Sequence, residues 1–206
     1  MNDPPDLIER VRRWVAQSGQ TPGPPTTAST IEIAEAELGF KLPPLLVRLY
    51  SEVGDGQFGP EYTLMPMVDG AAQTIVGDYH GVMANRDDSG FAWPAGVIPI
   101  LDWGCGMYAA VDCTVDSAPV RLYEPNGLSS GSGWHEAWFT DTATLDEWLE
   151  AWLSGAAWFS EDADPDQVHE PAPWDEVRVR LADRKPLREP AKKDKPSPHR
   201  KGKKRK

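Results

Sequence analysis

The segment VIPILDWGCGMYAAVDC, residues 97–113, decides the fold of this 206-residue chain. The apolar run Val97–Leu101 and the segment Met107–Thr114 have the composition of two buried strands. The residues between them, Asp102-Trp103-Gly104-Cys105-Gly106, are typical of a tight turn. Because connections this short join antiparallel strands, the sequence predicts a β-hairpin here.

The sheet and its last covering helix are predicted to follow the hairpin. Val120–Glu124 continues the sheet, Pro125-Asn126-Gly127 has turn chemistry, and 134–139 is compatible with either strand or loop. Thr144 and Glu147 then have the spacing of a capping box. The helix after them has an apolar face closed by Gly155, formed by Leu145, Trp148, Leu149, Trp152 and Leu153.

Three helices are predicted before the hairpin. Asp3 followed by Pro4 has the pattern of an N-cap and a first helical position. Ser29 and Glu32 have the spacing of a capping box for a second helix. Pro43 and Pro44 are tolerated only in a first turn, which predicts a third, short helix.

Three weaker elements complete the prediction. Glu61–Met65 is a short strand candidate, and Asp69 is placed to cap a helix with Ala72, Ile75, Val76, Tyr79 and Met83. Val177, Val179 and Leu181 alternate with arginines in the manner of an edge strand. The fold class is therefore α+β, a mostly antiparallel sheet with N-terminal helices and a closing C-terminal helix packed against it.

The charge is divided unevenly along the chain. The net charge is −11, but residues 185–206 contain eleven lysines and arginines against two acids, a net charge of +9. Residues 1–184 carry ten bases against 30 acids, a net charge of −20. So acidic a body disfavours nucleic acid and favours a basic protein partner. Only the Lys-rich tail is suited to nucleic acid.

Composition argues against several other classes. The start of the chain lacks the pattern of a secretory signal, and no run of 18 apolar residues offers a membrane span, so we expect a cytoplasmic protein. Cys105 and Cys113 have no histidines at metal-ligand spacing and are expected to be reduced core thiols. We therefore expect no metal and no cofactor.

Catalytic patterns are weak. The stretch SSGSG lacks the setting of a nucleophile elbow, and His135 with Glu136, the one pair that could line a pocket, is more typical of a solvated loop edge. We therefore predict a protein without enzymatic activity. Acids beside aromatic residues are instead typical of a protein-binding surface. The predicted partner-binding residues are Asp55, Asp87, Asp88, Asp102, Trp103, Trp134 and Glu136.

Three segments in order resemble the SMI1/KNR4 family of the SUKH superfamily. They are IEIAEAELGFKLPPLLVRLYSEVGDG at 31–56, the hairpin segment at 97–113, and TLDEWLEAWLSG at 144–155. The resemblance covers roughly residues 28–155. It departs from the family pattern at Val53, where the usual asparagine before the Gly-rich turn is missing.

The resemblance implies a non-enzymatic α+β domain that binds other proteins. Bacterial members are immunity proteins that neutralise a cognate toxin, often a nuclease, whereas fungal relatives are regulatory scaffolds. The acidic body favours an immunity-type protein with a basic toxin partner, and a scaffold without a toxin partner is the alternative. The expected organisation is an N-terminal helix and linker (1–27), an SMI1/KNR4-like domain (28–159), an acidic extension (160–184) and a basic disordered tail (185–206).

Overall fold

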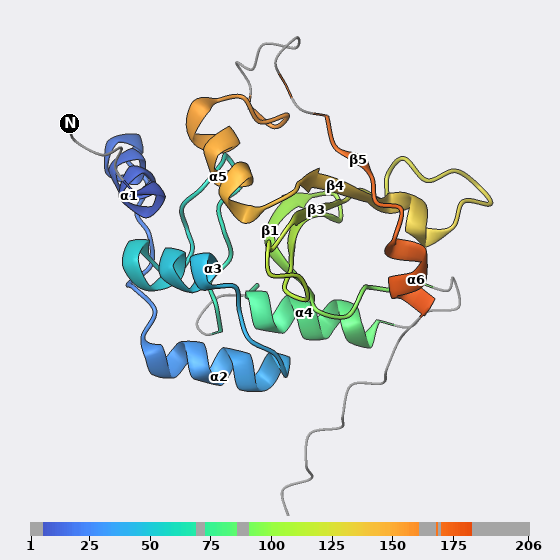
Figure 1. The fold of residues 1–206 in the computed structure, drawn as a ribbon, viewed down its shortest axis with the longest axis horizontal. Helices are drawn as coiled ribbons and strands as arrows, with labels where there is room; N and C mark the ends of the chain where they lie inside the picture. The colour runs from blue at the N-terminus through green and yellow to red at the C-terminus, as the bar shows by residue number, and fades with distance from the viewer. Residues whose placement is uncertain (1–5, 69–72, 86–90, 161–167, 169, 183–206) are drawn as a thin grey trace, which may run out of the picture.

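The computed structural model describes residues 6–68, 73–85, 91–160, 168 and 170–182 (Figure 1). They form an α+β fold around a five-stranded antiparallel sheet with the strand order β1-β2-β3-β4-β5. The elements are α1 (Leu7–Ser18), α2 (Ala28–Leu38), α3 (Pro44–Arg48), the π-helical turn η1 (Leu49–Val53), α4 (Ile75–Ala84), β1 (Val97–Gly104), β2 (Met107–Asp112), β3 (Val120–Tyr123), the 3₁₀ turn η2 (Trp134–Ala137), β4 (Trp138–Thr142), α5 (Leu145–Ser154), β5 (Ala172–Pro173) and α6 (Val177–Ala182).

The predicted hairpin is present as β1 and β2. β1 runs three residues further than expected, to Gly104, because the Asp102 carboxylate accepts a hydrogen bond from the Gly104 amide at 2.7 Å. The turn therefore shrinks to Cys105 and Gly106, which both have positive φ angles. The register shifts between Asp102 and Gly104, so Trp103 lies in a β-bulge.

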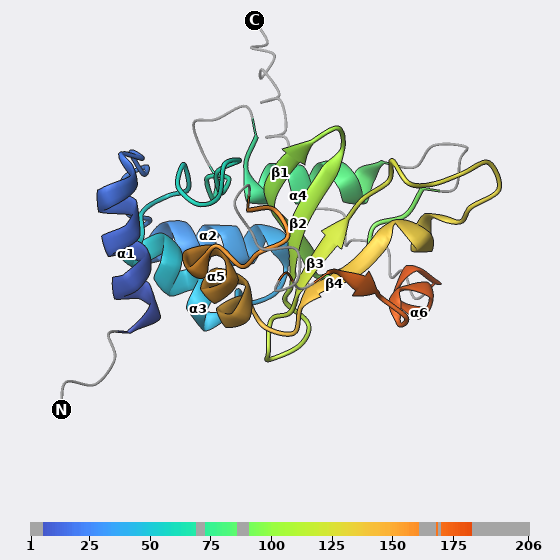
Figure 2. The same cartoon turned by 90° about the horizontal axis from the view of Figure 1, so that it is seen from above.

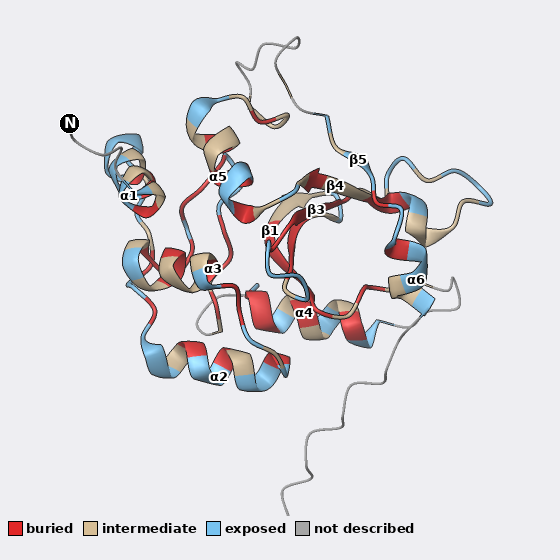
Figure 3. Ribbon diagram, viewed as in Figure 1, coloured by how far each residue is buried: buried red, intermediate tan, exposed pale blue. Residues whose placement is uncertain are grey.

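The helices gather mainly on one side of the sheet. Figure 2 shows α1, α2, α3 and α5 together on that side, with α6 at the opposite side of the strands. Helix α1 contributes Ile8, Val11 and Val15 to the hydrophobic core, and Val177 of α6 is also buried in it (Figure 3). Segments at both ends of the described chain thus pack into one core.

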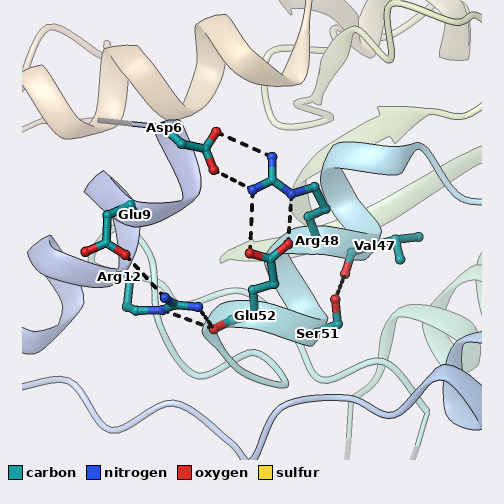
Figure 4. Close-up of polar contacts among 7 residues, drawn as sticks. All are labelled: Asp6, Glu9, Arg12, Val47, Arg48, Ser51 and Glu52. Carbon is teal, nitrogen blue, oxygen red and sulfur yellow. Dashed lines mark hydrogen bonds and ion pairs between the residues drawn. The ribbon is translucent and has the colours of Figure 1, made fainter. Parts of the chain in front are cut away.

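Ion pairs also hold α1 against η1 (Figure 4). The Arg48 guanidinium pairs with Asp6 at the start of α1 and with Glu52 of η1, where its Nε lies 2.8 Å from Oε1. Arg12 donates from Nη2 to the Glu52 carbonyl oxygen at 2.8 Å. Glu52 of η1 therefore accepts from two arginines, one in α1 and one in α3, which links the three elements.

Three predicted helix starts are wrong. Helix α1 begins at Leu7 because Asp6 still has an extended backbone, and α2 begins after Thr27, whose hydroxyl accepts from the Thr30 amide at 3.1 Å. Helix α4 begins after Thr74, whose hydroxyl accepts from Gly77. Several short polar side chains precede each helix, and any of them can cap it. Ser29, which was expected as a cap, lies inside α2, whereas Asp3 and Asp69 lie outside the described residues.

Two predicted strands are also wrong. Glu61–Met65 is an irregular segment whose Met65 amide donates to Ile100 of β1 at 2.9 Å. The alternating segment Val177–Leu181 is part of helix α6, in which Val179 is 68% exposed. The strand at the edge of the sheet is instead β5, paired with β4.

Candidate functional site

Three carboxylates lie at one end of the sheet. Asp102, Tyr108, Tyr123 and Trp138 are successive cross-strand partners in β1, β2, β3 and β4. Asp102 is in this row, Glu124 directly follows Tyr123, and Glu136 comes two residues before Trp138. We call Asp102, Glu124 and Glu136 the acidic end of the sheet.

Uncharged groups hold the first two of these carboxylates. Asp102 accepts from the Gln73 side-chain amide at 2.9 Å in addition to the Gly104 amide. Glu124 accepts from the Asn126 backbone amide at 2.7 Å. The same Asn126 donates from its side chain to the Cys105 carbonyl oxygen at 3.2 Å, which joins the β3–β4 loop to the β1–β2 turn. The carboxylates are thus oriented without being neutralised.

Glu136 is held in the same way. Its carboxylate oxygens accept from the Gly133 amide and from the Ser132 hydroxyl, both at 3.1 Å. These hydrogen bonds, the one from Gly133 first, lower the pKa of Glu136. The His135 Nε2 atom lies 3.7 Å from Glu136 Oε1. Glu136 therefore orders its own loop through its carboxylate oxygens.

Basic residues are scarce around this end. Residues 49–177 contain 23 acids and only two bases, Arg86 and Arg121. Arg86 lies outside the described residues, and Arg121 is directed at the buried Asp112. The helical side differs, because Arg10 pairs there with Glu150 and Lys41 with Glu35. Arg178, directly beyond this range, lines a pocket with Glu136 and helps to lower its pKa, whereas Asp102 and Glu124 pair with no basic side chain among the described residues.

A fourth carboxylate, Asp78 of α4, is electrostatically coupled to the acidic end. Burial, and after it the charge of Asp102, raises the pKa of Asp78. Burial together with Asp102 and Asp78 also raises the pKa of the Tyr108 hydroxyl. Like charges held near each other cost folding energy, and such strain is typical of functional sites.

We expect Asp78→Asn to stabilise the fold by roughly 0.5 kcal/mol at pH 7, since a half-exposed charge is strongly screened. The pKa of Asp78 is higher in the folded state than in the unfolded state, so the native protein binds more protons. The stability of the wild type therefore falls as pH rises between these two pKa values. The gain should therefore disappear below about pH 4. Urea unfolding at pH 7 and below pH 4 measures the gain in stability. Glu37→Gln, at an exposed position of α2, is the control. A loss of stability in Asp78→Asn at pH 7 would contradict the coupling.

An aromatic group borders the acidic end on the side of β1. Trp103 packs its ring against Phe159 at 4.8 Å and against Tyr62 at 6.0 Å. Tyr62 is 48% exposed and lines a shallow groove of about 380 Å³ that also includes Leu64, Met65 and Asp102. An exposed aromatic ring beside a carboxylate suits a lysine or arginine side chain, through cation–π and charge contacts.

Trp134 borders the other side of the acidic end. Its ring centroid lies 5.3 Å from that of Phe91, which in turn lies 6.3 Å from Tyr123. The structure thus brings four predicted site residues to the same end of the sheet, although the two tryptophans contact different neighbours. These four are Asp102, Trp103, Trp134 and Glu136.

Asp55 has a different position from these four. Its carboxylate accepts from the Met67 amide at 2.7 Å, and its own amide donates to the Gly23 carbonyl oxygen at 3.3 Å. A Cβ atom on Gly54 would lie 2.6 Å from that same carbonyl oxygen, so glycine is needed where these two loops meet. Asp55 thus ties loops together beside the groove. Asp87 and Asp88 lie outside the described residues.

Sequence reasoning missed Glu124, Asp78 and Tyr62. Glu124 could have been found, because in an antiparallel meander the end of the third strand meets the end of the first. Asp78 and Tyr62 have no such signal. Their neighbours on β1 and β2 are distant in sequence, and only packing brings them together.

The thiols and the possible metal ligands carry less information. Cys105 is exposed at the β1–β2 turn and is not the core thiol that the sequence predicts, whereas Cys113 is half-buried. Among the residues that the structure describes, no group of three or more His, Cys, Asp or Glu side chains is placed to hold a metal ion. In the same part of the chain, no helix combines the length and apolar character needed to cross a bilayer.

Comparison with known families agrees with the fold. The model of the SMI1 / KNR4 family (SUKH-1) matches residues 25–151, which run from α2 into α5 and include the first four strands. No curated protein matches the chain. The match covers more than half of the sequence and includes the first two segments on which the resemblance was based, together with residues 144–151 of the third. The chain therefore belongs to the SMI1/KNR4 (SUKH-1) family.

Proposed function

We propose that this protein is an immunity-type member of its family, which binds and neutralises a cognate toxin domain with a basic surface. The observation that carries the proposal is the acidic end, where Asp102, Glu124 and Glu136 are oriented by uncharged donors. Oriented carboxylates lose little freedom on binding, and they steer a basic partner to this surface. Inhibition then results from covering the partner's cleft and requires no catalysis by this chain.

A nuclease is the class of toxin that this surface fits best. A nuclease cleft binds phosphates through lysines and arginines, which carboxylates can engage in place of the nucleic acid. The groove beside Tyr62 and Trp103 adds the aromatic contacts that are enriched in interface hot spots. Charge then accounts for fast association, and the aromatic residues for slow dissociation.

Co-expression tests the proposed function. The C-terminal domain of a secreted protein encoded beside this gene is expressed in a bacterial host, with and without this chain. We expect the domain alone to stop growth and the pair to grow and to purify as a complex. Growth arrest that this chain does not relieve, with only regulatory proteins recovered on it, would favour a scaffold and contradict the proposal.

The role of the acidic end has its own prediction. We define the acidic-end variant as Asp102→Asn, Glu124→Gln and Glu136→Gln, in which each amide oxygen can still accept a hydrogen bond. Stopped-flow mixing with the toxin domain at ~20 mM NaCl should show association slowed about tenfold or more. At ~0.5 M NaCl the variant and the wild type should converge, because the charges are then screened.

A matched control separates local charge from net charge. The distal variant carries Glu32→Gln, Glu37→Gln and Asp116→Asn, three exposed acids on α2 and in the β2–β3 turn. It loses as many charges as the acidic-end variant, and we expect association to slow less than about threefold. Equal slowing in both variants would show that the acidic end is not the interface.

A further inference from the structure

The basic tail has the charge that the acidic end of the sheet lacks. Residues 185–206 carry a net charge of +9, whereas residues 49–177 carry 23 acids and two bases. Among the described residues, no lysine or arginine forms a hydrogen bond with Asp102, Glu124 or Glu136, which accept from amides and a hydroxyl. Only Glu136 has a basic side chain nearby, that of Arg178, which lines a pocket with it and helps to lower its pKa. The most basic segment of the sequence and a largely unpaired acidic surface therefore belong to the same molecule.

The length of the tail allows them to meet. Helix α6, which ends at Ala182, is held to the sheet because Arg180 of this helix binds Asp112 at 2.9 Å. A further 24 residues follow Ala182. At up to ~3.3 Å per residue these can span roughly 80 Å, more than the width of a domain of this size.

The groove beside the acidic end suits the tail in chemistry as well as charge. Its lining includes the exposed ring of Tyr62 and Asp102, with the largely buried Leu64 and Met65 beneath them. Lysine and arginine stems pack along apolar surface while their charged heads remain at a carboxylate or over an aromatic ring. A proline-rich basic segment can therefore lie along this groove without forming secondary structure of its own.

We propose that residues 185–206 bind the groove and the acidic end of their own molecule, so that the tail is an internal ligand of this surface. The link between the two makes the binding intramolecular, with an effective concentration in the millimolar range. An intrinsic dissociation constant of about 1 mM then leaves roughly half of the molecules with the tail bound. The consequence for toxin binding rests on the proposed function. A toxin must displace the tail from the acidic end, and polycations that bind more weakly than the tail are kept off this surface.

The native cysteines supply the experiment. Cys105 is exposed in the β1–β2 turn beside the acidic end. Cys113 is half-buried, and burial raises the pKa of its thiol, which favours labelling at Cys105. A nitroxide can therefore be attached to Cys105 of the full chain labelled with ¹⁵N. Paramagnetic broadening of the tail amides then reports whether the tail lies near the acidic end.

At ~20 mM NaCl we expect the tail amides to lose more than roughly half of their intensity relative to the ascorbate-reduced sample, and to regain it at ~0.5 M NaCl. The acidic-end variant should show little broadening at low salt, and the distal variant should broaden like the wild type. Unbroadened tail amides at low salt would overturn the proposal. Equal broadening in both variants would also overturn it, because the tail would then follow net charge alone. No partner is needed, so this result is independent of the proposed function.

Discussion

Asp112→Ala is expected to lower the free energy of unfolding by about 3–5 kcal/mol. Asp112 is fully buried, and its carboxylate binds Arg180 at 2.9 Å and the Thr114 hydroxyl at 2.7 Å. Arg121, which is also buried, lies 3.9 Å away. Burial lowers the pKa of Arg121, and Asp112, followed by Glu176, counteracts this effect. Removing Asp112 leaves two arginines without their buried counter-ion.

Urea unfolding followed by circular dichroism measures this loss. Asp112→Asn keeps the size of the side chain and removes only its charge, so it should reproduce most of the effect. The control is Glu150→Gln, which breaks the partly exposed pair with Arg10 and should cost at most about 1 kcal/mol. Similar losses in Asp112→Ala and Glu150→Gln would mean that the buried cluster is not what holds α6 to the sheet.

Trp93→Ala is expected to lower the free energy of unfolding by about 3–5 kcal/mol, because it opens a cavity in the core. Trp93 is fully buried, with its indole N–H donating to the Val97 carbonyl oxygen at 2.7 Å. Its ring lies within 6 Å of those of Tyr108, Tyr123 and Trp138, edge-on to each. These three rings belong to the row that ends in Asp102, so the variant should also weaken the acidic end.

Trp134→Ala is the comparison for Trp93→Ala. Trp134 is half-buried and belongs to the same aromatic group through Phe91. We expect a loss below about 1.5 kcal/mol, because less apolar area returns to water on truncation. Urea unfolding of both variants at pH 7 measures the two losses of free energy. A loss for Trp134→Ala as large as that for Trp93→Ala would contradict the assignment of Trp93 as the centre of this face.

Much of the fold could be predicted from local patterns. The hairpin at 97–113 and the helix after Thr144 are present, because an apolar run with a tight turn, or a capping residue before an apolar stripe, involves only neighbouring residues. The Thr144 hydroxyl accepts from the Glu147 amide at 3.0 Å, as the spacing predicts. The elements that were wrong depend on distant contacts. Alternation at 177–181 predicts a strand, yet Arg180 and Val177 place a helix against the sheet.

The candidate site divides in the same way. Asp102, Trp103, Trp134 and Glu136 were expected at a binding surface because acids and aromatic residues are adjacent in sequence there. Glu124 and Asp78 join them only through strand register and helix packing. Asp55 was expected at the binding surface, but its carboxylate accepts from the Met67 amide and ties two loops together.

The sequence by itself determined the family, the hairpin and the separation of a basic tail from an acidic body, because composition and short-range pattern need no knowledge of distant contacts. The tertiary structure alone decided which carboxylates lie together and which are compensated. Arg180 is 68 residues from Asp112 and cancels its charge, whereas Asp102 and Glu124 share an end of the sheet and receive only uncharged donors. Coulomb energy depends on distance in space and on burial, and the order of residues along a chain specifies neither.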